Sequence, residues 1–195
     1  MDSTLLTAVI IVGITGGFIF LFSYLHKVKV KTRIAKRKLV YSGVICQHKL
    51  EVSEREEIND YIVVIDKANF LLLHIDFSDH QEEITLVDLW DIKKAELDLQ
   101  ERIIYEPKGG KFAPVEKQVI KLHLAIILKD PDQPRQLLSF YQFDKHNVQD
   151  LKITKQRVEY WRDIIQDCVK ELPYPSSSAS GLQFKKLPGV SLQNL

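Results

Sequence analysis

Hydrophobic and polar residues are distributed differently in the first and the later parts of the chain. From Leu5 to Leu25 the sequence LLTAVIIVGITGGFIFLFSYL contains no charged residue and no proline. A run of about 20 apolar residues is long enough to cross the hydrocarbon core as a helix. Every face of such a helix would be apolar here, whereas a helix on the surface of a folded domain has a polar face. The pattern predicts a transmembrane helix over 5–25.

After Leu39 the apolar positions fall into short runs that are typical of β-strands. We expect strands at 41–50, 61–66, 70–76, 84–86, 95–105, 118–128 and 136–143. The segment 61–76 reads as a hairpin around 67–69, and the segments 51–60 and 106–116 read as a polar break and a loop. In 118–128 the side chains of Ile120, Leu122, Leu124, Ile126 and Leu128 share one fully apolar face, which should face the core.

The period changes once more near the end of the chain. Apolar residues then recur every three, four or seven positions, at Leu151, Val158, Trp161, Ile165, Cys168 and Leu172. This spacing predicts an amphipathic helix, with Asn147 as its N-cap and Pro173 as its stop. Residues 173–195 are rich in Ser, Gly and Pro, and we expect a disordered tail. The patch 184–187 within it is either ordinary tail sequence or a docking motif.

Charge is unevenly distributed along the chain. The stretch that follows the apolar run is strongly basic, and the rest of the chain carries more acidic than basic residues. The basic residues are Lys27, Lys29, Lys31, Arg33, Lys36, Arg37 and Lys38. We therefore expect four parts: a transmembrane anchor (1–26), a basic linker (27–38), a folded domain (39–172) and the tail (173–195). The mildly acidic domain argues against nucleic acid as a partner.

The basic stretch also predicts an orientation. No positive charge precedes the apolar run and no cleavage site follows it, so we expect an uncleaved anchor. The positive-inside rule then places the N-terminus outside and the domain in the cytoplasm, at the plasma or inner membrane if the protein is bacterial. The basic residues either mark this topology alone or hold the domain against anionic lipid. Gly13 and Gly17 either support a homodimer of helices or are ordinary membrane-helix glycines.

No motif for catalysis or cofactor binding occurs in the sequence, so we expect neither an enzyme nor a cofactor or metal. His74, Asp76, Asp79 and His80 form the one cluster with metal-ligating side chains, and a solvated strand end is the simpler reading of it. His123 is expected on the exposed face of its strand. Cys46 and Cys168 are expected to be buried, reduced thiols.

The order of the predicted elements resembles that of a pleckstrin-homology-like (PH or GRAM) domain. The segment 83–99, EITLVDLWDIKKAELDL, carries the likeness, because it is similar to the part of that superfamily where one strand ends, a turn follows and the next strand begins. The matching positions are Leu89, Asp91, Ile92, Glu96 and Leu97. The terminal helix with Trp161 resembles the helix that closes one end of the barrel in that superfamily.

The resemblance implies an α+β fold: the transmembrane helix, then a PH-like antiparallel β-barrel or sandwich of six to seven strands, capped by the C-terminal amphipathic helix. It also implies a binding or scaffolding surface. The loops 53–60 and 67–69 hold few basic residues, so inositol-phosphate binding is not implied. We therefore expect a membrane-anchored module that acts through protein or membrane-surface contacts, with an unknown protein partner. The alternatives are a small enzyme that uses His74, Asp76 and His80, and an accessory subunit of a membrane complex.

Overall fold

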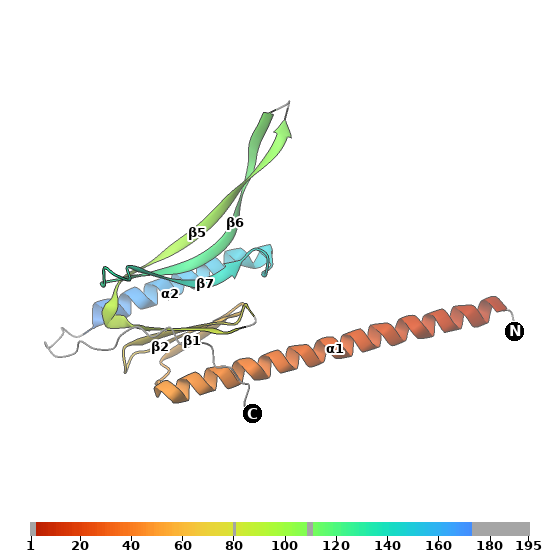
Figure 1. Cartoon of the computed structure of the whole chain (residues 1–195), viewed down its shortest axis with the longest axis horizontal. Helices are drawn as coiled ribbons and strands as arrows, with labels where there is room; N and C mark the ends of the chain where they lie inside the picture. Colours follow the sequence, from red (N-terminus) through yellow and green to blue (C-terminus); the bar gives the residue numbers. More distant parts are fainter. Residues whose placement is uncertain (1–2, 80, 109–110, 173–195) are drawn as a thin grey trace. The chain divides into compact units, whose positions relative to one another are not determined.

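The computed structural model describes the backbone of residues 3–79, 81–108 and 111–172, and side chains within 15–79, 81–105 and 116–172. The chain divides into two compact units, residues 1–48 and 49–195. Figure 1 shows the first unit as one long helix and the second as β-sheets with a shorter helix. The predicted tail, including 184–187, lies outside the described residues.

The first unit is helix α1, which runs from Ser3 to His48 without interruption. No glycine or proline occurs between Gly17 and Gly43, so nothing in this stretch breaks the helix. Lys49 follows with a φ of 50°, the left-handed conformation that commonly ends a helix. The predicted strand at 41–50 is therefore wrong, because its apolar residues continue the helix.

The prediction of a transmembrane anchor is also wrong. Among the residues that the structure describes, no helix combines the length and the apolar character needed to cross a membrane. Within the part of α1 whose side chains are described, seven Lys and Arg residues lie between Lys27 and Lys38. The predicted single-pass localisation and its orientation lose their basis with this finding.

The second unit begins with a four-stranded antiparallel sheet in the order β1-β2-β3-β4. Its strands are β1 (Glu54–Ile58), β2 (Tyr61–Asp66), β3 (Leu71–Asp76) and β4 (Glu83–Asp88). The predicted hairpin of β2 and β3 is confirmed, with Val63 opposite His74. The predicted polar break at 51–60 is wrong in part, since it contains β1. Asn59 turns the chain from β1 into β2 with a φ of 54°, a conformation that Asn tolerates well.

A three-stranded antiparallel sheet follows, in the order β5-β6-β7. It contains β5 (Ile92–Lys108), β6 (Lys111–Leu128) and β7 (Arg135–Gln142), and the 3-10 turn η1 (Leu89–Asp91) leads into it from β4. The strands β5 and β6 continue through most of the predicted loop 106–116. They therefore form a hairpin much longer than the sequence pattern suggests, and it extends beyond the end of β7 (Figure 1).

Helix α2 (Leu151–Glu171) closes the second unit, preceded by the 3-10 turn η2 (Val148–Asp150). The Asn147 side chain caps η2 by accepting a hydrogen bond from the Gln149 N–H (3.1 Å). The predicted amphipathic helix is confirmed: its inward face buries Val158, Trp161, Ile165 and Cys168. The helix contacts β5, β6, β7 and η1.

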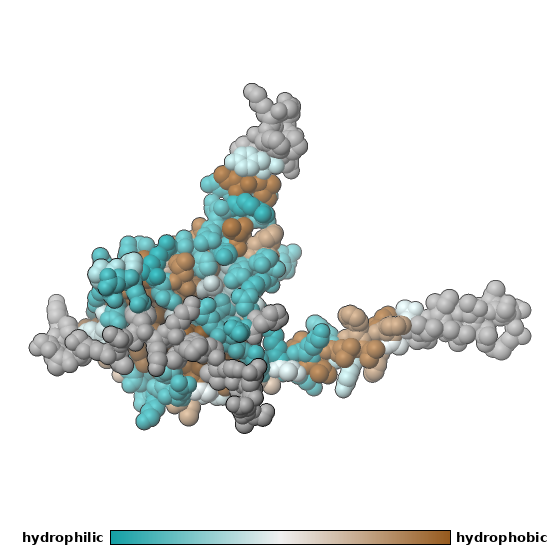
Figure 2. Space-filling model, in the orientation of Figure 1, coloured by the Kyte–Doolittle hydropathy of each residue, from teal (hydrophilic) through white to brown (hydrophobic). Residues whose placement is uncertain are grey.

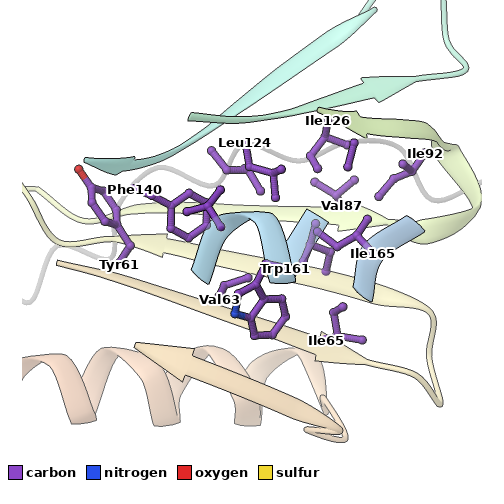
Figure 3. Packing of buried hydrophobic residues seen from close by; sticks show 14 of the residues in the cluster. Tyr61, Val63, Ile65, Val87, Ile92, Leu124, Ile126, Phe140, Trp161 and Ile165 are labelled. Carbon is purple, nitrogen blue, oxygen red and sulfur yellow. The ribbon is translucent and has the colours of Figure 1, made fainter. Parts of the chain in front are cut away.

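The two sheets and α2 share one hydrophobic core, shown in Figure 3. Leu122, Leu124, Ile126 and Leu128 of β6 belong to it, which confirms the predicted core face of that strand. The prediction of a closed barrel is wrong, because the described strands form two separate sheets joined by η1. The fold of the described residues is α+β, with two antiparallel sheets and two α-helices.

Candidate functional site

Two buried histidines contact Ser139 on β7, and one of these contacts joins the two sheets. The Nε2 atom of His74, on β3, lies 2.9 Å from the Ser139 carbonyl oxygen, on β7. A carbonyl only accepts, so this nitrogen carries the proton and donates it. The Ser139 hydroxyl lies 3.1 Å from Nδ1 of His123, on β6. Burial lowers the pKa of both imidazoles, and both are therefore kept neutral.

The burial of His123 corrects the prediction for this residue. His123 was expected on an exposed face, but it is buried. Alternation along β6 still places His123 on the face opposite Leu122 and Leu124, but it lies there between Asp98 of β5 and Ser139 of β7 and is not solvated. His74 is buried as well and its proton is committed to a structural hydrogen bond.

The cluster of metal-ligating side chains around His74 does not converge in the described part of the chain. Asp76 accepts the Ser78 N–H (2.7 Å), and Asp79 pairs with Lys145 Nζ (2.5 Å). His80 lies outside the described residues. Among the others, no group of three His, Cys, Asp or Glu side chains is placed to hold a metal ion. The side chains of this cluster instead serve local turns and an ion pair.

Aromatic rings surround His74 at the same end of the core. Tyr61 stacks on His74 with ring centroids 5.7 Å apart, and Phe140 meets His74 edge-on at 5.2 Å. Tyr61 is labelled at the end of the core in Figure 3, with its hydroxyl directed away from the packed side chains. Burial and the Asp76 carboxylate raise the Tyr61 pKa well above its usual range, so the phenol stays neutral. This cluster is a packed, desolvated part of the core, and its role is structural.

The acidic run 51–60 contains a second structural group that the sequence did not reveal. Glu56, on β1, accepts hydrogen bonds from the Trp161 indole N–H and from Arg157 Nε, both on α2. Arg157 also donates to the Glu57 carbonyl oxygen (2.6 Å). Alternation along 54–58 places Glu56 on the same face as the buried Ile58. Arg157 and Trp161 lie one helical turn apart, on one face of α2. These two spacings are the signal in the sequence for this group of contacts.

The outer part of the β5–β6 hairpin carries two exposed apolar side chains. We call residues 101–108 and 111–119 the arm, because they pair with each other beyond the end of β7. The backbone contact of the β7 side with β6 ends at the Ile120 carbonyl oxygen, which accepts a hydrogen bond from the Phe143 N–H (2.9 Å). Ile103 and Tyr105 are 43% and 54% exposed. They lie on the same face of β5, because strand residues two apart share one face. Figure 2 shows hydrophobic and hydrophilic patches along the arm.

The same face of β5 lies toward the core nearer the body of the domain. Ala95 is buried in the core, and Leu97 and Leu99 pack against it. Ile103 and Tyr105 continue this row beyond the point where core side chains are available to cover it. An isolated two-stranded ribbon is marginally stable in water, and exposed apolar patches commonly mark interaction sites. The arm is therefore the candidate interaction surface.

The predicted membrane-related residues lie on α1. The side chains of Leu5 and Gly13 are outside the described residues, and a Cβ atom added at Gly17 would meet no atom within 4 Å. The basic residues are exposed, except for half-buried Arg37. Cys46 is exposed rather than buried, and Cys168 is buried as predicted; both are free thiols. Burial raises the Cys168 pKa, which makes this thiol unreactive.

Comparisons with known proteins add no identification. No protein-family model, no curated protein and no solved structure matches the chain.

Proposed function

We propose that the chain is a protein-interaction module that uses the arm as its docking surface. The observation that carries the proposal is the pair of exposed apolar side chains, Ile103 and Tyr105, on a hairpin that leaves its sheet. Aromatic side chains are enriched at the centres of protein interfaces because they bury a large area with few rotatable bonds.

The resemblance to PH-like domains supports a binding or scaffolding role. Strand β4 ends at Asp88, η1 turns the chain at Leu89–Asp91, and β5 begins at Ile92, as the likeness of 83–99 implied. The Asp88 carboxylate accepts the Trp90 N–H (2.8 Å) and fixes this turn. The turn between β2 and β3 offers Lys67 alone as a basic residue, and Lys67 is paired with Glu54 (2.7 Å). A protein ligand therefore fits this module better than an inositol phosphate.

The test is capture of binding proteins by the full chain in cells of its source, compared between variants. Ile103→Glu and Tyr105→Glu place a charge on the exposed face of the arm without changing the core. Val148→Glu is the matched control, because Val148 is 53% exposed and lies outside the arm, in η2. We expect the two arm variants to lose a specific set of captured proteins that the control retains. Identical capture by all variants would show that the arm is not the docking surface.

A further inference from the structure

The outer edge of β5 is available for pairing with another strand. In the described part of the chain, β5 is hydrogen-bonded to β6 on one side and is an edge strand on the other. Along an edge strand, every second residue directs its backbone N–H and C=O groups outward, and these groups are a template for another strand. The edge of the arm is long, and Glu101, Arg102, Ile103 and Tyr105 are exposed along it.

The sequence along this edge is complementary to itself. From Gln100 to Lys108 it reads QERIIYEPK, with Ile104 at its midpoint. Arg102 and Glu106 lie two positions before and after Ile104 and carry opposite charges. Ile103 and Tyr105 lie one position before and after it, and both are apolar or aromatic. An antiparallel copy of the same strand would therefore meet a matching residue at each of these positions.

We propose that a second copy of the chain pairs with this edge, β5 to β5, about a two-fold axis at Ile104. Ile104 then lies opposite its own counterpart, Ile103 opposite Tyr105, and Arg102 opposite Glu106. Because the dimer is symmetric, the Ile103–Tyr105 pair and the Arg102–Glu106 pair each occur twice. Opposite charges and aromatic–β-branched pairs directly across an antiparallel pair are stabilising, and like charges there are destabilising. The inference and the proposed function both concern the arm, and the inference does not otherwise rest on the proposed function.

Other symmetric registers of the same edge match less well. A centre at Arg102 places two arginines opposite each other and Asp98 opposite Glu106. A centre at Glu101 places two glutamates opposite each other. A centre at Ile103 places Arg102 opposite Ile104, so a charge meets an apolar side chain. Charge complementarity thus selects Ile104 as the centre.

Pairing would also stabilise the arm, which on its own has only two strands. The two arms would form one four-stranded antiparallel sheet in the order β6-β5-β5-β6, and sheets of three or more strands are far more stable than a single ribbon. Pro107 has no N–H to donate, so it limits the pairing to the residues on its N-terminal side. The isologous contact closes on itself and produces a dimer instead of a filament.

Cysteine crosslinking of the purified full chain tests the pairing and its register. In a background of Cys46→Ser and Cys168→Ala, Ile104→Cys should form an intermolecular disulfide under mild oxidation. The reason is that Cα atoms directly opposite in an antiparallel pair are about 4.5 to 5.5 Å apart, within disulfide reach. Gln118→Cys is the matched control, since it lies opposite Arg102 on β6. Two such residues would be about 20 Å apart, three strand spacings across the sheet and four residues along it.

The expected result is a disulfide-linked dimer with Ile104→Cys and none with Gln118→Cys. No dimer at either position, or equal yields at both, would overturn the proposal. Equal yields at both positions would mean non-specific collision, or association through another surface. Because only the purified chain is used, the outcome does not depend on any other binding protein.

A charge reversal then tests the Arg102–Glu106 pairs in the Ile104→Cys background. Arg102→Glu should lower the crosslinking yield at matched concentration by roughly tenfold, since two attractive pairs become repulsive. Adding Glu106→Arg should restore the yield, because both pairs are then re-formed with reversed signs. Unchanged crosslinking with Arg102→Glu, or no recovery in the double variant, would overturn this register. Arg102→Glu retains Ile103 and Tyr105, so loss of the dimer with retained capture of other proteins would separate this inference from the proposed function.

Discussion

The Trp161 indole N–H donates a hydrogen bond to the Glu56 carboxylate and thereby ties α2 to the edge strand β1. The indole is fully buried in the core, whereas the carboxylate lies at its border. Arg157 donates to the other carboxylate oxygen from 2.6 Å, one helical turn before Trp161. A single acidic side chain thus satisfies a buried donor and a cation, both on the helix that closes the core.

We expect Glu56→Ala to lower the free energy of unfolding by about 2 to 3 kcal/mol. It removes two charge-assisted hydrogen bonds and leaves the buried indole N–H without an acceptor. Glu56→Gln keeps a neutral acceptor of the same shape and should cost less than Glu56→Ala. Urea unfolding of the full chain, followed by tryptophan fluorescence, measures both. Glu96→Ala is the control, because the Lys94–Glu96 pair is exposed and should contribute less than about 1 kcal/mol.

The sequence was most informative where the periodicity was long and uninterrupted. The β2–β3 hairpin, the core face of β6 and helix α2 all follow from spacing alone. The sequence was misleading where the same residues suit two structures. Val44 and Ile45 fit a strand by composition, yet they belong to α1, which continues through Gly43 to His48. The division into two sheets depends on the turn η1, whose Asp88 cap carries no periodic signal.

The candidate interaction surface was harder to predict than the core. Glycines and prolines suggested a loop at 106–116, but β5 and β6 stay paired through most of it, with a β-bulge opposite Ile104 and Tyr105. The burial of His123 depends on its neighbours Asp98 and Ser139 on the adjoining strands. Alternation of polar and apolar residues shows on which face a side chain lies, and it does not show whether that face is covered.

Two isoleucines of α2 provide a direct test of the packing. Ile165 is fully buried in the core, whereas Ile153 is 58% exposed on the same helix. We expect Ile165→Ala to lower the free energy of unfolding by about 2 to 5 kcal/mol, because it removes buried apolar atoms and leaves a cavity. Ile153→Ala should change it by less than about 0.5 kcal/mol. Equal effects in urea titrations of the two variants would mean that α2 packs through a different face.

The buried histidines predict a loss of stability on acidification. Burial lowers the folded-state pKa of His74, so below its unfolded-state pKa of about 6.5 the unfolded chain binds more protons than the folded one. Stability then rises with pH in this window and falls as the pH drops from 7 toward 5. For one such group the slope approaches about 1.4 kcal/mol per pH unit.

His74→Gln should flatten this dependence, because glutamine can still donate to the Ser139 carbonyl oxygen but does not titrate. His26→Gln, at an exposed position of α1, is the matched control and should leave the slope unchanged. Urea unfolding at several pH values between 5 and 7 measures the slopes. Identical slopes in wild type and His74→Gln would contradict the assignment of this proton to His74.

Asp66 predicts a further loss of stability at lower pH. Burial alone would raise its pKa, but hydrogen bonds from the Asn69 side chain (2.7 Å), the Asn69 N–H (2.8 Å) and the Glu51 N–H (2.7 Å) lower it overall. A carboxyl whose folded-state pKa is depressed stabilises the fold above its unfolded-state pKa of about 3.9, and this contribution is lost as the pH falls through the folded-state value.

Asp66→Asn should therefore destabilise the protein at pH 7 by about 1 to 2 kcal/mol, since an amide nitrogen cannot accept the N–H donors that one carboxylate oxygen now serves. The difference from wild type should shrink between pH 5 and pH 2, where the wild-type carboxylate itself becomes protonated. Asp132→Asn, in the exposed turn between β6 and β7, should show no such convergence. Urea midpoints measured across this range test the prediction, and a constant difference for Asp66→Asn at every pH would mean that the charge of Asp66 contributes nothing to the fold.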